Sequence, residues 1–175
     1  MLTDLSPLIA ATAHWLTAAF PPYGGALASA RCEAQARQAV TVAAWLRYPT
    51  ALDAGLVALV GPGGAARLDR ITGADADDGT READTAWRTW VDEVVASWAA
   101  ALLADPDLAG RAMEALAEGE HTKTAPVEFR RLLTPDEDDR RAAALLRHPD
   151  LLASVAELHH ARLLDRLAPG RAVTA

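Results

Sequence analysis

The chain has 175 residues and a mass of 18.5 kDa, the size of one domain that buries roughly 70% of its unfolded surface without disulfide or metal support. Its 41 Ala and 24 Leu stand against only 2 Ile and 10 Val, which favours helices and argues against sandwiches, barrels and doubly wound α/β folds. A formal net charge of -7 and a pI near 5.1 disfavour a nucleic-acid partner, because duplex-binding domains usually present a basic face.

The first part of the chain predicts three helices that end at proline or glycine. Apolar residues at helical spacing predict the first helix over about 6–20, where a Pro-Pro pair ends it. The second is expected over about 29–47, before Pro49, and a shorter third over about 50–60, before a Gly-Pro-Gly-Gly run. We expect residues 61–79 to form an irregular connection.

The strongest helical pattern follows, over about 81–104, with Thr80 as its N-cap. At 100° per residue, its large apolar side chains fall within a sector of roughly 140°. These residues are Trp87, Trp90, Val91, Val94, Val95, Trp98, Ala101 and Leu102. The sequence therefore predicts one amphipathic helix that buries its Trp face.

Further helices are expected in the last third of the chain. Asp105-Pro106-Asp107 predicts the start of a helix that ends near residue 118. Residues 119–133 are expected to form a second irregular connection. Thr134-Pro135-Asp136-Glu137 matches a capping box that starts a helix ending near His148. The final helix is expected over about 150–167, followed by a disordered tail over 169–175.

Three helix junctions share one pattern, in which an apolar helix end is followed by two residues and then by Pro49, Pro106 or Pro149. Such short links make the flanking helices neighbours, either antiparallel or sharply bent. The spacings between these prolines are 57 and 43 residues, whereas a solenoid usually keeps its period. We therefore predict a single all-α domain over 1–175, with about seven helices in a globular bundle. A short irregular α-solenoid is the alternative.

Two segments have the Glu-x-x-His spacing of di-iron helical bundles, in which a carboxylate and an imidazole on one helix face hold a metal ion. They are Glu118 with His121 and Glu157 with His160, and Glu33 and Glu93 are the candidate partner carboxylates. Gly119 lies inside the first pair, at an expected helix end. The alternative interpretation is that these side chains are surface or capping residues. No cofactor is predicted.

Arg141 and His148 form a second candidate site, separated by six residues on one predicted helix face. This spacing resembles the Arg-x(4–6)-His motif of helical HEPN ribonucleases, and the resemblance implies RNA cleavage supported by Arg141 and His148. Ala142 follows the Arg, where that family often has a polar side chain. The alternative is a solvated Arg141, with His148 stabilised at a helix C-terminus by the helix dipole.

Five Trp residues exceed what a small core needs, and Trp is frequent at the centre of protein interfaces. We therefore list Trp87, Trp90 and Trp98 as candidate interaction residues, with core packing as the alternative. The function expected from these features is a non-catalytic helical module that binds another protein or a second copy of itself. The alternatives are a small enzyme that uses one of the two candidate sites and a sensor with a Trp-lined pocket.

Cys32 is the only cysteine, so an intrachain disulfide and a multi-cysteine zinc site are excluded. No base accompanies Cys32 or any Ser in a recognisable catalytic motif. The uncharged stretch over 5–30 is interrupted by prolines and glycines, and Asp4 stands where a secretory signal has basic residues. We expect a cytoplasmic protein without a membrane segment. The excess of Arg over Lys indicates a GC-rich genome.

Overall fold

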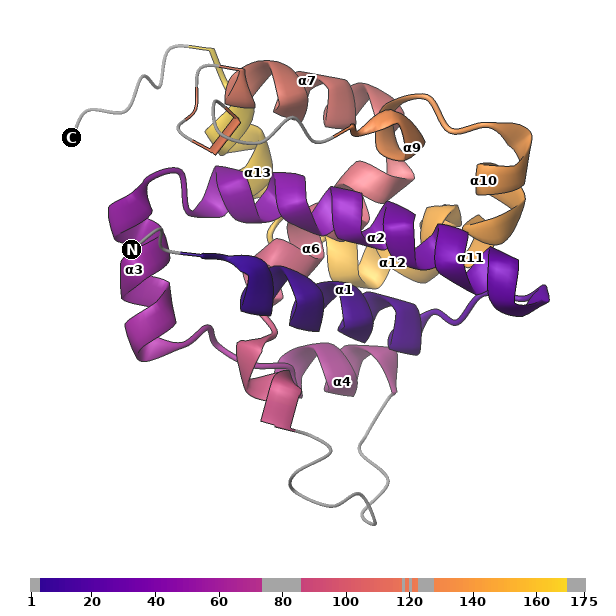
Figure 1. The fold of residues 1–175 in the computed structure, drawn as a ribbon, viewed down its shortest axis with the longest axis horizontal. Coiled ribbons are helices and arrows are strands. Elements are labelled where there is room, and N and C mark those ends of the chain that lie inside the picture. The colour runs from indigo at the N-terminus through magenta and orange to yellow at the C-terminus, as the bar shows by residue number, and fades with distance from the viewer. Residues whose placement is uncertain (1–3, 74–85, 118, 120, 123–127, 170–175) are drawn as a thin grey trace.

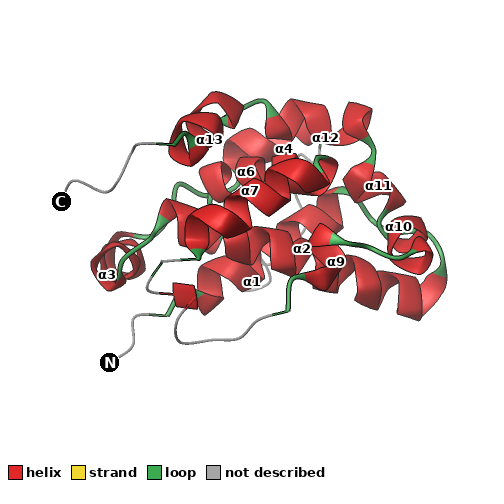
Figure 2. Ribbon diagram, turned by 90° about the horizontal axis from the view of Figure 1, so that it is seen from above, coloured by secondary structure: helices red, strands yellow, loops and turns green. Residues whose placement is uncertain are grey.

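The computed structural model describes residues 4–73, 86–117, 119, 121–122 and 128–169. Within these ranges the fold is all-α and contains no strand, which confirms the predicted class (Figure 2). The number of helices in the described residues is higher than the predicted seven. Three of the predicted helices are divided, and two short helices lie in segments that were expected to be irregular. The elements are α1 (Ser6–Ala19), α2 (Gly25–Arg47), α3 (Ala51–Val60), α4 (Ala66–Thr72), the 3-10 helix η1 (Ala86–Trp90), α6 (Glu93–Ala104), α7 (Pro106–Leu116), α9 (Arg130–Leu133), α10 (Glu137–Ala142), α11 (Ala144–Arg147), α12 (Pro149–Ala156) and α13 (His160–Leu167).

Helix α2 is the centre of the fold and runs along most of the length of the molecule, with α3 beyond its C-terminal end (Figure 1). It packs most extensively against α6 and α1, and α6 also packs against α12. Small side chains allow these close contacts, since Ala36 and Ala39 on α2 and Ala96 and Ala99 on α6 are fully buried. The abundant Ala in the sequence therefore serves tight helix packing around one apolar core.

Helix α1 is fixed to the core by a buried polar group as well as by apolar contacts. The Trp15 indole Nε1 donates to the Asp69 carboxylate on α4 at 2.9 Å. Arg88 of η1 forms an ion pair with the same carboxylate. Burying a carboxylate costs free energy unless it is paired. These two donors therefore explain how the Asp69 side chain of α4 is tolerated in a buried position.

The predicted helix over 81–104 is divided, and this is the largest correction to the sequence-based elements. Asp92 adopts an extended conformation and caps α6 by accepting hydrogen bonds from the backbone N–H groups of Val94 and Val95. The Tyr48 hydroxyl donates to the same carboxylate. Residues 86–90 of the predicted helix form the 3-10 helix η1, whereas Thr80 and residues 81–85 lie outside the described residues. Trp87 and Trp90 therefore do not share a helix with Trp98.

Two other predicted helices are also divided. The helix expected from Thr134 begins at Glu137, because Asp136 rather than Thr134 is the N-cap and forms its capping box with Asp139. A turn at Ala143 then separates α10 from α11. The final helix is interrupted between α12 and α13, where Ser97 and Trp98 on α6 bind the backbone of this junction.

Three further helices differ from the prediction: one begins earlier than expected, and two were not predicted. Helix α2 begins at Gly25, four residues before its predicted start. Helix α4 lies inside the segment 61–79 and is followed by Gly73, which has the positive φ of 71° that suits a helix C-cap. Helix α9 occupies the end of the segment 119–133. The proline junctions are confirmed at Pro106 and Pro149, which are the first residues of α7 and α12. Pro49 does not start a helix, because α3 begins at Ala51 after its N-cap Thr50.

No described helix combines the length and the apolar character that a membrane crossing requires.

Candidate interaction surface

Helix α3 follows α2 after a short turn and begins with a complete capping box. The Thr50 side chain accepts from the Asp53 backbone N–H, and the Asp53 carboxylate accepts from the Thr50 backbone N–H at 3.0 Å. On the inner side of the helix, Ala54 and Val57 are buried at 0% and 8% exposure. The capping box thus starts α3, and these two residues hold it against the rest of the protein.

The outer side of α3 carries an exposed apolar surface, which we name the α3 stripe. At 100° per residue its four members lie within a sector of about 100°. They are Leu52, Leu56, Leu59 and Val60, with exposures of 72%, 53%, 84% and 84%. The three Leu residues follow one another at steps of four and three residues, the spacing of a coiled-coil seam.

Helix α3, which carries the stripe, lies at one end of the molecule in both ribbon views (Figure 1, Figure 2). None of the more extensive helix–helix packings in the described part of the chain includes α3. No charged residue occurs between Asp53 and Arg67 in the sequence. Large Leu and Val side chains grouped on one unpartnered, uncharged face are typical of an interaction surface.

Sequence reasoning missed this surface, although a signal for it was present. Helix α3 has one charged residue, Asp53, and all its other residues are Ala, Gly, Leu or Val, so no side of the helix apart from Asp53 is polar. A helix that is apolar all round needs cover on more than one side. The sequence does not reveal that the fold covers only one of them.

The Trp residues predicted to contact a partner are placed differently from one another. Trp98 is 3% exposed, and its Nε1 donates to the His159 backbone carbonyl at 3.1 Å. It therefore belongs to the core rather than to a surface. Trp87 and Trp90 are half-buried and pack against the core, with Trp87 edge-on to the His14 ring at 4.5 Å between centroids.

Glu157 and His160, predicted from the Glu-x-x-His spacing, line one pocket of about 260 Å³ although they are not on one helix. Glu157 directly follows α12, and His160 is the first residue of α13. The other lining residues come from α6, α7 and α12 and are mostly small: Ala101, Ala104, Asp105, Leu108, Ala153 and Ala156. We name this hollow the Glu157–His160 pocket.

The remaining metal candidates do not gather around one point. Glu118 lies outside the described residues, and His121 contacts the Tyr48 backbone carbonyl through its Nε2 at 2.7 Å. Glu33 is exposed on α2, whereas Glu93 pairs with His159 at 3.3 Å. Among the residues that the structure describes, no group of three or more His, Cys, Asp or Glu side chains could hold a metal ion.

Arg141 and His148, the pair that resembles the HEPN motif, do not share a helix. Arg141 is in α10, where its guanidinium pairs with Asp138 at 2.7 Å. His148 precedes α12, beyond the turn that ends α10. The one continuous helix that would have placed both side chains on a shared face is therefore not formed.

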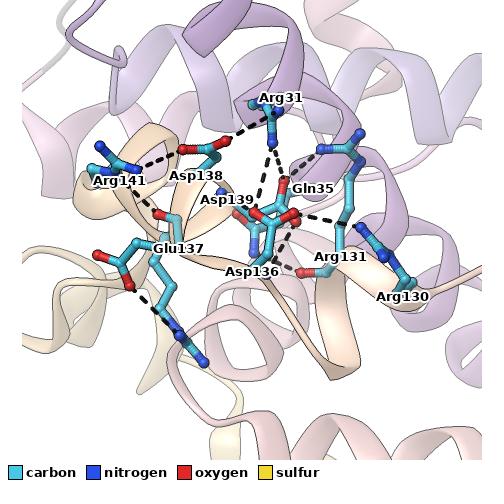
Figure 3. Close-up of polar contacts among 10 residues, drawn as sticks. Arg31, Gln35, Arg130, Arg131, Asp136, Glu137, Asp138, Asp139 and Arg141 are labelled. Carbon is cyan, nitrogen blue, oxygen red and sulfur yellow. Dashed lines mark hydrogen bonds and ion pairs between the residues drawn. The ribbon is translucent and has the colours of Figure 1, made fainter.

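A cluster of charged residues connects α10 to α2 and α9, and Asp139 is at its centre (Figure 3). The Asp139 side chain is 1% exposed and pairs with Arg31 at 3.3 Å and with Arg131. Asp138 lies between Arg31 and Arg141. A pocket of about 370 Å³ is lined by Arg31, Asp138 and Arg141 together with the exposed Tyr23 and Leu27. Acids and guanidinium groups already neutralise each other here.

Two candidate nucleophiles are held in their protonated forms. Burial raises the pKa of the Cys32 thiol to about 11. Burial, together with the hydrogen bond to Asp92, raises the pKa of the Tyr48 hydroxyl well above its ordinary value. Because the thiolate or phenolate is the reactive form, neither group is an activated nucleophile near neutral pH.

Comparison with known proteins adds no assignment: no protein-family model, curated protein or solved structure matches the chain.

Proposed function

We propose that the protein is a non-catalytic helical interaction module whose contact surface is the α3 stripe. The observation that carries this proposal is the 53–84% exposure of four large aliphatic side chains on one face of a short helix. Covering an exposed Leu or Val with apolar partner atoms yields about 1.5–3 kcal/mol when burial is complete. Four adjacent residues of this kind therefore favour association with another apolar helix face.

The charge distribution supports the same surface. The chain is acidic, with a net charge of -7, yet the segment between Asp53 and Arg67 is uncharged. Charged side chains are depleted at the centres of protein interfaces because they must be desolvated there. The stripe therefore meets the condition for the centre of an interface, whereas the pocket beside Arg31 and Arg141 does not.

Site-specific photo-crosslinking in the producing cell tests this function. With p-benzoylphenylalanine in place of Leu59, we expect a discrete crosslinked product that is lost when Leu56→Asp is added. The same group at Glu33, an exposed residue of α2, serves as the control. The captured protein is then purified and titrated, and Leu56→Asp should weaken its binding at least 10-fold. Equal labelling at positions 59 and 33, or unchanged affinity, would overturn the proposal.

A second candidate function, binding of a small organic cation, is favoured by the Glu157–His160 pocket. Its floor is apolar, with Ala101 and Leu108 at 4% and 3% exposure. Glu157 and His160 also line the pocket and contribute a carboxylate and an imidazole. An alkyl chain on this floor would bring an ammonium group near the carboxylates of Glu157 and Asp105.

Titration with n-butylammonium, followed by NMR chemical shifts, tests this candidate. We expect saturable shifts of residues at the pocket, and at least a fivefold loss of affinity in Glu157→Gln. Ala153→Phe, which fills the hollow, should abolish binding without affecting the α3 stripe. Butanol of the same length is the uncharged control. Shifts that are linear in concentration, or equal for butanol, would remove this function.

A further inference from the structure

The α3 stripe has the properties of a self-complementary surface, and we infer that its partner is a second copy of this chain. The two copies would meet through their α3 helices, related by a two-fold axis that passes close to Leu56. This inference rests on the proposed interaction function and names its partner. Four observations support it, concerning charge, spacing, position and area.

The first observation concerns charge. Two copies each carry a net charge of -7, so a symmetric contact that included carboxylates would place like charges opposite one another. On α3 the only charged group is Asp53, and its carboxylate is occupied by the Thr50 backbone N–H and hydroxyl at 3.0 and 2.6 Å. The stripe is therefore a surface on which two acidic copies can meet without charge repulsion at the contact.

The second observation concerns spacing and selectivity. Leu52, Leu56 and Leu59 repeat at the four–three spacing of a coiled-coil seam, so two identical stripes can interdigitate. The residues beside the stripe, Ala51 and Gly55, are small and allow the two helices to approach closely. Helical pairs that select a different partner use charged residues beside the seam. Since α3 has none there, the stripe matches an identical helix at least as well as any other.

The third observation is the position of the helix. Helix α3 projects at one end of the molecule in both views (Figure 1, Figure 2). A two-fold axis beside it therefore brings two α3 helices together before the larger bodies of the two copies meet. The pocket lined by Tyr23 and Leu27 lies near the start of α2, and α3 follows the end of α2. A contact between these two unlike surfaces would instead produce open-ended assemblies.

The fourth observation is area. At about 100 Å² of apolar surface for each exposed aliphatic residue, two stripes bury about 800 Å². The uncharged residues 61–64, which directly follow α3, bring the total to about 1,000 Å², near the lower limit for specific interfaces. The expected assembly is thus a reversible dimer whose population depends on concentration, rather than a permanent one.

Sedimentation velocity between 1 and 500 µM tests the dimer. The weight-average mass of the wild-type chain should rise from 18.5 kDa toward twice that value, whereas Leu56→Asp should stay monomeric, with association at least 100-fold weaker. Leu27→Asp is the matched control, because Leu27 is also exposed, at 70%, but lies at the other end of α2. It should associate as the wild type does. Circular dichroism checks that both variants are folded.

A disulfide trap reports the geometry independently of the Asp variants. Leu56→Cys should form a covalent dimer on mild oxidation, and Leu27→Cys should not, while the native Cys32 is buried. A wild-type chain that remains monomeric at 500 µM, a dimer that survives Leu56→Asp, or open-ended assembly would overturn the symmetric dimer. If the monomeric chain still gives the stripe-dependent crosslink to a different protein, the interaction function stands and only the choice of partner is wrong.

Discussion

Replacing Asp139 with Ala is expected to lower the free energy of unfolding by about 2–4 kcal/mol. The Asp139 carboxylate is 1% exposed and pairs with Arg31 of α2 and Arg131 of α9. It also accepts from the Asp136 backbone N–H at 3.3 Å, which completes the capping box of α10. The loss therefore combines one of the two hydrogen bonds of the capping box with two ion pairs. The side chains of Arg31 and Arg131 are 24% and 33% exposed. Water can therefore replace part of the hydrogen bonding that their guanidinium groups lose with the Asp139 carboxylate.

The neighbouring Asp138 provides the control for this prediction. Its side chain is 58% exposed and also contacts Arg31 and Arg141, so Asp138→Ala should cost about 0.5 kcal/mol, as exposed pairs do. Urea denaturation of both variants measures the difference. Equal destabilisation by the two substitutions would show that Asp139 does not join α10 to α2 and α9 as its burial indicates.

Much of the fold is predictable from the sequence because local chemistry determines it. The abundance of Ala and Leu predicted an all-α chain, and Pro106 and Pro149 do begin helices, as residues without a backbone N–H can at a first turn. The breaks within the predicted helices, by contrast, depend on residues that are distant in the sequence. Asp92 caps a new helix while it accepts from Tyr48, 44 residues earlier. The break before α13 is held by Ser97, 62 residues before His159. Such partners are distant in the sequence, so periodicity cannot reveal these breaks.

The candidate surface was less predictable than the fold for a related reason. The size and number of the Trp residues made Trp98 a predicted interaction residue, but the fold places that side chain in the core. Leu59, one of 24 Leu, has no distinguishing feature in the sequence and is 84% exposed. Residue type predicts which side chains can form an interface. Only the packing of α3 at the edge of the fold shows which of them are left uncovered.

Replacing Trp98 with Ala distinguishes a core residue from an interface residue, and we expect the core result. The side chain is 3% exposed, so its removal should lower the free energy of unfolding by about 3–5 kcal/mol. For a chain of this size, the melting temperature should fall by roughly 10–15 °C. Trp98→Phe keeps most of the apolar volume but removes the donor to the His159 carbonyl, and should cost only about 1–2 kcal/mol.

The same variants connect core packing to association. Since Trp98 lies on α6 and the proposed dimer contact lies on α3, Trp98→Phe should leave the concentration dependence of the sedimenting mass unchanged. Leu56→Asp should show the opposite behaviour: it should lose association and change the melting temperature by no more than 2 °C, because its side chain is exposed. Trp98→Phe that retained its stability but lost association would place the interface at Trp98. The core contacts and the α3 stripe are therefore separable by two measurements on two variants.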